Sequence, residues 1–170
     1  NLIPLKRVDL LIEALRLTTT AVEWTHYGGG PEQERLRALS ATLPPHVQCQ
    51  WKGAVANREV LKHYRTQPVD LFVHLSSTEG GVPVALQEAA SFGIPLLAAD
   101  VGGVGEIVGP TTGILLPSEP SATQVATELD RFRQGPFATS EARLQVREQW
   151  SASYQGPANF GHFCDLLLGA

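Results

Sequence analysis

The chain has 170 residues, of which 43% are hydrophobic and 18% charged, with a formal net charge of −4. This size and composition fit a single folded domain and exclude a disordered chain. The negative net charge argues against a nucleic-acid partner held by bulk electrostatics, although a small anionic ligand needs only a local positive site. No apolar run approaches the ~20 residues that cross a bilayer, and no signal-peptide pattern is present.

The sequence begins at Asn1 and contains no methionine, so we expect it to be a piece of a longer protein. Cys49 and Cys164 are too few for a disulfide framework and lack the spacing of metal ligands. We therefore expect two reduced thiols in a cytoplasmic protein, with membrane association of the parent protein left open.

Apolar periodicity alternates between the helical and the strand type along the chain. Asn57 is predicted to be an N-cap and Gly93 a helix stop. The most apolar strand, 69–77, is predicted for the middle of a sheet that is covered on both faces. Helices are predicted over 8–17, 32–43, 57–65, 83–93, 121–133, 139–150 and 159–169, and strands over 21–27, 47–53, 69–77, 94–100 and 113–117.

Strands separated by helices of this length predict right-handed crossovers and a parallel sheet. The predicted fold class is α/β, with a Rossmann-like open parallel sheet, helices on both faces and a helical C-terminal end. Such sheets bind ligands at the carboxyl ends of their strands. The loops 28–31, 53–57, 76–82 and 100–105 fall there.

The stretch TEGGVPVALQEA, residues 78–89, carries the most informative chemistry. Gly80 and Gly81 let the backbone approach a ligand, and the first N–H groups of the helix that starts near Val82 face outward with partial positive charge. Together they suit a phosphate or a carboxylate. Glu88 can accept two hydrogen bonds from a vicinal diol, and Glu79 can meet a second hydroxylated group. A site for a diol, then a phosphate, then a sugar predicts a nucleotide sugar as the ligand. The alternative is a tight turn with two solvated glutamates.

The longer stretch SSTEGGVPVALQEAASFGIPLLAADVGGVGEIV resembles the signature of the group 1, retaining GT-B glycosyltransferases. The resemblance continues through LIPLKRVDLLIEAL, YGGGPEQERL, VQCQWKGAV and the tail W…NFGHF, so it covers essentially the whole chain. It covers only the C-terminal half of the family's two-domain architecture. The resemblance therefore implies that residues 1–170 are a single donor-binding domain, one half of a GT-B fold, without the N-terminal acceptor domain.

The resemblance also implies roles for particular residues. Glu79 would contact the donor sugar, Lys6 would stabilise the departing diphosphate, and Glu88 would bind the ribose hydroxyls. The backbone around Val55 would hold the base, and no metal or other cofactor is implied. The sugar and phosphate would be held by the turn formed by Gly80, Gly81, Val82, Pro83 and Val84.

Three departures from the family pattern stand out. Eight residues separate Glu79 from Glu88 where the family has seven, which leaves the reach of Glu79 open. Asn1 occupies the position of the family's phosphate-binding arginine. The family's first strand would lie before Asn1, and a sheet without it has an exposed edge or a less stable fold.

Other residues have less specific readings. Gly102 and Gly103 are expected either to line the donor cleft with Glu106 or to form a plain loop into a short helix. His74 is expected to be a bonded core or rim histidine rather than a catalyst. The tryptophans Trp24, Trp51 and Trp150 are expected to pack in the core.

The predicted function is the donor-binding part of a retaining glycosyltransferase that moves a sugar from a UDP-, GDP- or ADP-type donor to a glycan or lipid-linked acceptor. The fragment alone is expected to be inactive. Two alternatives are a non-catalytic nucleotide-sugar-binding module of the same fold and a GT-B sugar-nucleotide epimerase. The base, the sugar, the acceptor and the oligomeric state stay open.

Overall fold

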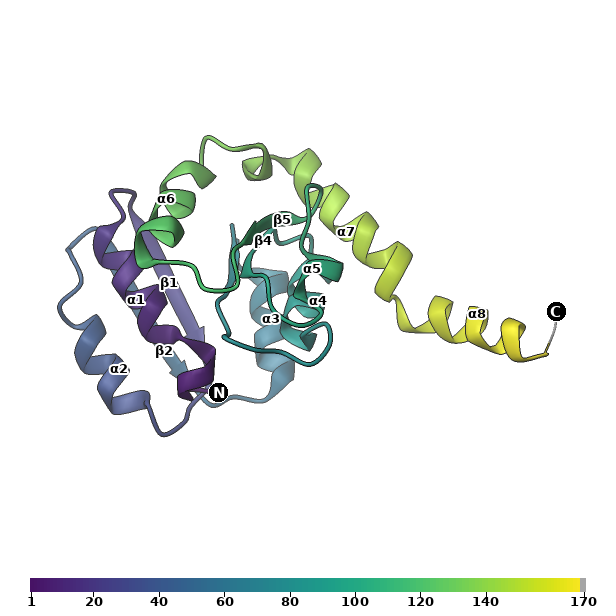
Figure 1. Ribbon diagram of the computed structural model, residues 1–170, viewed down its shortest axis with the longest axis horizontal. Coiled ribbons are helices and arrows are strands. Elements are labelled where there is room, and N and C mark those ends of the chain that lie inside the picture. Colours follow the sequence, from purple (N-terminus) through teal and green to yellow (C-terminus); the bar gives the residue numbers. More distant parts are fainter. Residues whose placement is uncertain (169–170) are drawn as a thin grey trace.

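A computed structural model describes residues 1–168, which form an α/β domain with helices on both sides of parallel strands (Figure 1). The strands are β1 (Val22–Tyr27), β2 (Val47–Gly53), β3 (Phe72–His74), β4 (Leu96–Ala99) and β5 (Gly113–Leu116). The helices are α1 (Val8–Leu17), α2 (Gln33–Ser40), α3 (Asn57–Thr66), α4 (Val84–Ser91), α5 (Val104–Ile107), α6 (Ala122–Phe132), α7 (Ser140–Tyr154) and α8 (Gly156–Leu168). Single 3-10 turns cover Pro4–Lys6 and Pro136–Ala138.

The predicted elements and the parallel strand direction are confirmed. Helix α1 and strand β2 have the predicted bounds. Gly93 ends the α4 segment with a positive φ of 68°, as expected of a helix stop. The last predicted helix is present as α8 up to Leu168, and its final residue, Gly169, lies outside the described residues.

The strands pair in two groups, β1 with β2 and β3 with β4 and β5, and no ladder joins the groups within residues 1–168. The segment 2–7 links their ends. The Leu2 N–H donates to the Gly29 carbonyl after β1 at 2.9 Å, and the Ser77 N–H after β3 donates to the Leu5 carbonyl at 2.9 Å. This segment therefore holds the two strand groups in a fixed relation at their carboxyl ends.

The predicted centre of the sheet is wrong. The strand within 69–77 spans only Phe72–His74, pairs only with β4 and is partly exposed. Strand β4 is instead the buried centre, with all four residues buried, because it is the strand with a partner on each edge. Apolar composition reports the tendency to be buried, whereas position in the sheet depends on pairing with distant strands.

The alternating side chains of β4 belong to two cores. Leu96 and Ala98 pack with α4, α5 and α7, whereas Leu97 packs with α1 and α6. Helices therefore cover both faces of β4. The three tryptophans pack against core clusters as predicted: Trp24 and Trp51 meet edge to face at 4.9 Å between ring centroids beside a third cluster of Leu2, Ile12 and Leu36, and Trp150 packs against the α4 side.

Helix α7 packs against the α4 side of the domain and α8 extends away from it (Figure 1), which matches the predicted helical C-terminal end. Among residues 1–168, no helix combines the length and the apolar character needed to cross a lipid bilayer.

The carboxylate of Asp130 fastens the connection between α1 and β1 to helix α6. It accepts hydrogen bonds from the Thr19 N–H at 3.0 Å, the Thr20 N–H at 3.0 Å and the hydroxyls of Thr18 and Thr19. Burial alone would raise the pKa of this carboxyl, but the hydrogen bonds outweigh it and hold the pKa well below its usual value.

Replacing Asp130 with asparagine is expected to lower the free energy of unfolding at pH 7 by ~1–2 kcal/mol, because charge-assisted acceptors are lost. A lowered pKa in the folded state stabilises the fold above the unfolded pKa, and that contribution disappears as the pH falls below ~4. The difference in the free energy of unfolding between wild type and variant, measured by urea unfolding, should therefore become smaller as the pH is lowered. Glu128→Gln, two residues earlier in α6 and bonded only to Arg131 among residues 1–168, is the matched control; an equal loss in both variants would contradict the prediction.

Candidate functional site

The loops after the strands meet at one edge of the domain, as predicted from the parallel topology. The Gly28 N–H donates to the Gly53 carbonyl at 2.8 Å, which joins the loops after β1 and β2. The loop after β4 touches the loop after β3, because a Cβ added to Gly102 would lie 2.0 Å from the Glu79 carbonyl oxygen. The sequence between β3 and α4 therefore lies at the junction of these loops.

The turn between Glu79 and α4 presents free backbone donors. Helix α4 begins at Val84, one residue after the predicted bound at 83, with Pro83 as its N-cap and no side chain capping it. Its first N–H groups and those of the preceding turn find no acceptor among residues 1–168. The unpaired N–H groups belong to Gly80, Gly81, Val82, Val84 and Ala85.

The space in front of this turn is open. A Cβ added to Gly80 or Gly81 would meet no described atom within 4 Å, and neither glycine has a positive φ. The backbone therefore does not need glycine at these two positions for conformational reasons. By contrast, Gly102 has a φ of 54°, and a Cβ on Gly103 would lie 2.6 Å from the backbone of Gly81. These two glycines pack directly against the turn.

The loop 100–103 thus has a supporting role that the sequence did not reveal. The loop leads into a short helix, since α5 begins at Val104, and the expectation that Gly102 and Gly103 line the donor cleft with Glu106 stays a prediction. Side chains at either glycine would push the Glu79–Val82 turn out of place.

Lys6 and Glu79, 73 residues apart, form an ion pair with 2.5 Å between Nζ and Oε1. His74, the last residue of β3, places its Nε2 2.9 Å from the same Oε1. Burial alone would raise the pKa of the Glu79 carboxyl, but the hydrogen bond of Lys6, the Ser76 hydroxyl and the charges of Lys6 and His74 hold that pKa below its usual value. The expected hydrogen bond of His74 is therefore confirmed, and its partner is a predicted site residue.

Burial and the charge of Lys6 lower the pKa of His74, against the opposing effect of the Glu79 carboxylate. The imidazole is therefore neutral at pH 7, and because a carboxylate only accepts, its Nε2–H donates to Glu79 Oε1.

Glu88 lies on α4 and is held from the loop after β2. The side-chain amide of Asn57 donates to Glu88 Oε1 at 2.8 Å. The predicted N-cap role of Asn57 is wrong: α3 begins at Asn57 itself, and its N-cap, Ala56, makes no side-chain cap. Val55, two residues before Asn57, is 40% exposed in the same loop. The loop predicted to hold the base is thus tied to the residue predicted to hold the ribose.

Arg7 is a structural residue of the site that sequence reasoning missed. Its guanidinium donates to the carbonyls of Leu75 at 2.5 Å, Ser76 at 2.9 Å and Ser118 at 2.9 Å. It therefore joins the turn that carries Lys6 to the ends of β3 and β5. Its charge is committed to carbonyl oxygens, so it does not replace the anion contact expected of an arginine at position 1. Adjacency to Lys6 was its only sequence signal.

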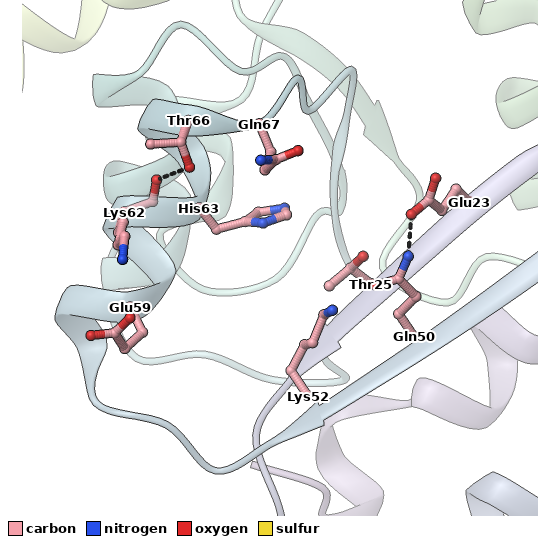
Figure 2. Close-up of a pocket in the computed structure, with 9 residues that line it drawn as sticks. All are labelled: Glu23, Thr25, Gln50, Lys52, Glu59, Lys62, His63, Thr66 and Gln67. Atoms are coloured by element: carbon pink, nitrogen blue, oxygen red, sulfur yellow. Dashed lines mark hydrogen bonds between the residues drawn. The ribbon is translucent and has the colours of Figure 1, made fainter.

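Two cavities lie elsewhere. One, of about 360 Å³, lies between β1, β2 and α3 and is lined by polar side chains that include Lys52, Lys62 and His63 (Figure 2). The other, of about 460 Å³, lies beside β5 and α6. Neither is lined by Glu79 or Glu88, so the candidate site belongs to neither cavity.

Comparison with known proteins gives consistent relatives. A GDP-mannose-dependent alpha-mannosyltransferase of Mycobacterium tuberculosis is 32% identical over 173 residues, which cover 99% of this chain and 40% of that protein. The apo lipopolysaccharide outer core galactosyltransferase WaaB has the same fold, with a TM-score of 0.80, 23% identity and coverage of 96% of this chain and 45% of WaaB. Anabaena HepE in complex with UDP-glucose also has this fold, with a TM-score of 0.79 and 20% identity. The match covers 100% of this chain and 47% of HepE.

The chain spans about two fifths of the length of the curated relatives that it matches. The profile of the family described as "Glycosyl transferases group 1" matches residues 1–151, which include every candidate site residue named above. The chain therefore belongs to the group 1 glycosyl transferase family, and its fold is that of the GT-B glycosyltransferases.

Proposed function

We propose that residues 1–170 form the donor-binding domain of a retaining glycosyltransferase and that the acceptor is held by another domain of the same protein. The observation that carries this proposal is the open turn between Glu79 and α4. Its N–H groups have no acceptor among residues 1–168 and the Cβ positions of Gly80 and Gly81 meet no described atom, with an ion-paired glutamate on one side and a tethered glutamate on the other. Because the two glycines place no side chain in front of these donors, a phosphate can approach them.

The proposed division of labour follows the chemistry of a nucleotide sugar. The turn N–H groups and Lys6 bind the diphosphate, and Lys6 stabilises the charge that develops on it as the sugar leaves. Glu79 accepts hydrogen bonds from the sugar, Glu88 accepts them from the ribose, and the backbone near Val55 holds the base. This assignment needs no metal ion, because the backbone donors and one lysine supply the positive potential.

Two of the comparisons support the donor class. HepE is a structural neighbour solved with UDP-glucose bound, and the mycobacterial relative is named as GDP-mannose-dependent. We therefore propose a nucleoside-diphosphate sugar as the donor and a glycan or lipid-linked alcohol as the acceptor. The chain alone is expected to bind the donor weakly and to transfer no sugar, because nothing in it is assigned to the acceptor.

Calorimetric titration with UDP-glucose, GDP-mannose and ADP-glucose tests the proposal directly. The chain 1–170 and the intact gene product should both bind at least one of the three at concentrations up to the millimolar range. Binding by the intact gene product alone would remove the claim that residues 1–170 are the self-sufficient donor domain. Binding by neither would overturn the proposed function.

Replacing Gly80 and Gly81 with alanine tests the open turn. The fold should tolerate both methyl groups, with the free energy of unfolding changed by less than ~1 kcal/mol, because neither φ is positive and neither methyl group meets an atom. Donor affinity should fall at least tenfold, since the methyl groups occupy the space through which a phosphate reaches the N–H groups.

Gly109→Ala is the matched control, because a Cβ there also meets no described atom within 4 Å, at a position outside the turn. It should leave both stability and donor affinity unchanged. Unaltered donor binding in the Gly80→Ala and Gly81→Ala variants would mean that the anion binds elsewhere.

A further inference from the structure

The two partners of Glu79 differ in how firmly they are held. His74 is fixed by β3, where it pairs with Ala98 in the parallel ladder, and its side chain is 10% exposed. Lys6 reaches Glu79 through a flexible four-carbon stem, and its side chain is 30% exposed. Both donate to Oε1. The buried hydroxyl of Ser76 also interacts with this carboxylate and lowers its pKa, and no other described residue donates a hydrogen bond to Oε2.

The proposed role of Lys6 creates a conflict that His74 can resolve. If Lys6 moves to the diphosphate, Glu79 loses the ion pair that fixes its side chain in the empty site. Its backbone stays in place against Gly102, but its rotatable bonds become free, which costs conformational entropy when a sugar binds. A second, rigid donor on Oε1 keeps the carboxylate in one orientation without using Oε2.

We propose that His74 is the positioning residue of the donor-sugar site: its Nε2–H holds Oε1 of Glu79 while Lys6 is transferred to the diphosphate, so that Oε2 remains available to a hydroxyl of the sugar. This inference rests on the proposed function. It goes further by assigning a role to His74. It also states that His74 stays bonded to Glu79 when the donor binds, whereas Lys6 moves away from it.

The arrangement also links donor binding to protonation. The charged groups that act on the His74 imidazole are Glu79, from the loop after β3, and Lys6, from the Pro4–Lys6 turn. A diphosphate beside Lys6 offsets the positive charge that disfavours the imidazolium. The pKa of His74 therefore rises on binding, binding takes up protons, and affinity gains a component that increases as the pH falls towards that pKa.

Calorimetry on four variants tests the proposal, with UDP-glucose and GDP-mannose compared with UDP and GDP. His74→Phe, which keeps a ring but removes the donor, should weaken the nucleotide sugar at least tenfold and the sugar-free diphosphate less than about twofold, since a hydrogen bond to a charged group contributes ~1.5–3 kcal/mol. His74→Gln, which keeps an N–H donor near the same place, should restore most of that affinity.

The double variant decides between positioning and general support of the loop. In a Glu79→Ala background, His74→Phe should have no further effect on the affinity for the nucleotide sugar. Proton uptake on donor binding can be measured by calorimetry in buffers of different ionisation enthalpy. It should be smaller in His74→Gln than in wild type, because the variant has no imidazole to take up a proton. Urea unfolding of each variant shows whether the fold is intact.

Three results would overturn the inference while the proposed function stands. In the first, the wild type binds nucleotide sugars, and His74→Phe weakens binding of the sugar-free diphosphate as much as it weakens binding of the nucleotide sugar. Another is an additive loss in the Glu79→Ala background, and the third is proton uptake unchanged in His74→Gln. A wild-type chain and an intact gene product that bind no nucleotide sugar would overturn the proposed function as well.

Discussion

Replacing Glu88 with alanine in the intact gene product is expected to lower the rate of donor turnover by roughly 100- to 1000-fold, the cost of about two charge-assisted hydrogen bonds to a diol. In the proposed site this carboxylate is the only group assigned to the ribose. Without it the ribose is not held, and the attached diphosphate is positioned less precisely. The measurement is the release of nucleoside diphosphate from whichever nucleotide sugar the protein binds.

Two further variants show whether the effect is specific to the site. Glu13→Ala, on the exposed face of α1, should leave turnover unchanged. Asn57→Ala should reduce turnover less than Glu88→Ala does, because it removes only the 2.8 Å hydrogen bond that holds the Glu88 carboxylate. If the wild type binds the donor but releases no diphosphate, the non-catalytic binding module becomes the better interpretation.

Replacing Arg7 with alanine should lower the free energy of unfolding by ~3 kcal/mol, because three carbonyl oxygens lose a charged donor at once. Two of those carbonyls, of Leu75 and Ser76, directly precede the loop that carries Glu79. Donor affinity should therefore fall together with stability. Urea unfolding and donor titration of the same sample measure both effects.

The backbone of Arg7 provides an internal comparison. Its φ of 45° lies in the left-handed region, which costs a residue with a Cβ ~1 kcal/mol or more and costs glycine little. Arg7→Gly should consequently be less destabilising than Arg7→Ala, although both lose the guanidinium. Arg58→Ala, whose side chain is 85% exposed and pairs only with its neighbour Glu59, should change stability by less than ~0.5 kcal/mol. Equal losses for Arg7→Ala and Arg58→Ala would contradict the assigned role.

Local periodicity indicated where helices and strands form, because the spacing of apolar residues along a segment reflects which of its faces is buried. The apolar spacing of 8–17 gave α1 its bounds, and the alternation in 47–53 gave β2 its bounds. The Glu-Gly-Gly turn also carried its own signal, since glycines before a helix expose N–H groups whatever the rest of the chain does. Glu79 and Glu88 were therefore found as candidates before any fold was known, whereas Lys6 became a candidate only through the resemblance to the family.

The contacts among those candidates could not be predicted, because they join residues far apart in sequence. Asn57 had the right residue type for an N-cap, but tertiary structure placed Glu88 within its reach, and the side chain bonds there instead. His74 had the pattern of a buried strand residue, and only the path of the loop after β3 brings Glu79 back to it. Arg7 had no signal beyond its charge, since its acceptors are backbone carbonyls, which every residue has.

The sequence by itself thus determined which elements form and which residues have the chemistry to meet a nucleotide sugar. The tertiary structure alone decided that β4 is the buried strand, that Gly102 supports the Glu79 turn, and that one carboxylate oxygen takes both Lys6 and His74. The physical reason is range: helix and strand periodicity arises between neighbours a few residues apart, whereas strand order and side-chain pairing depend on how those elements pack together.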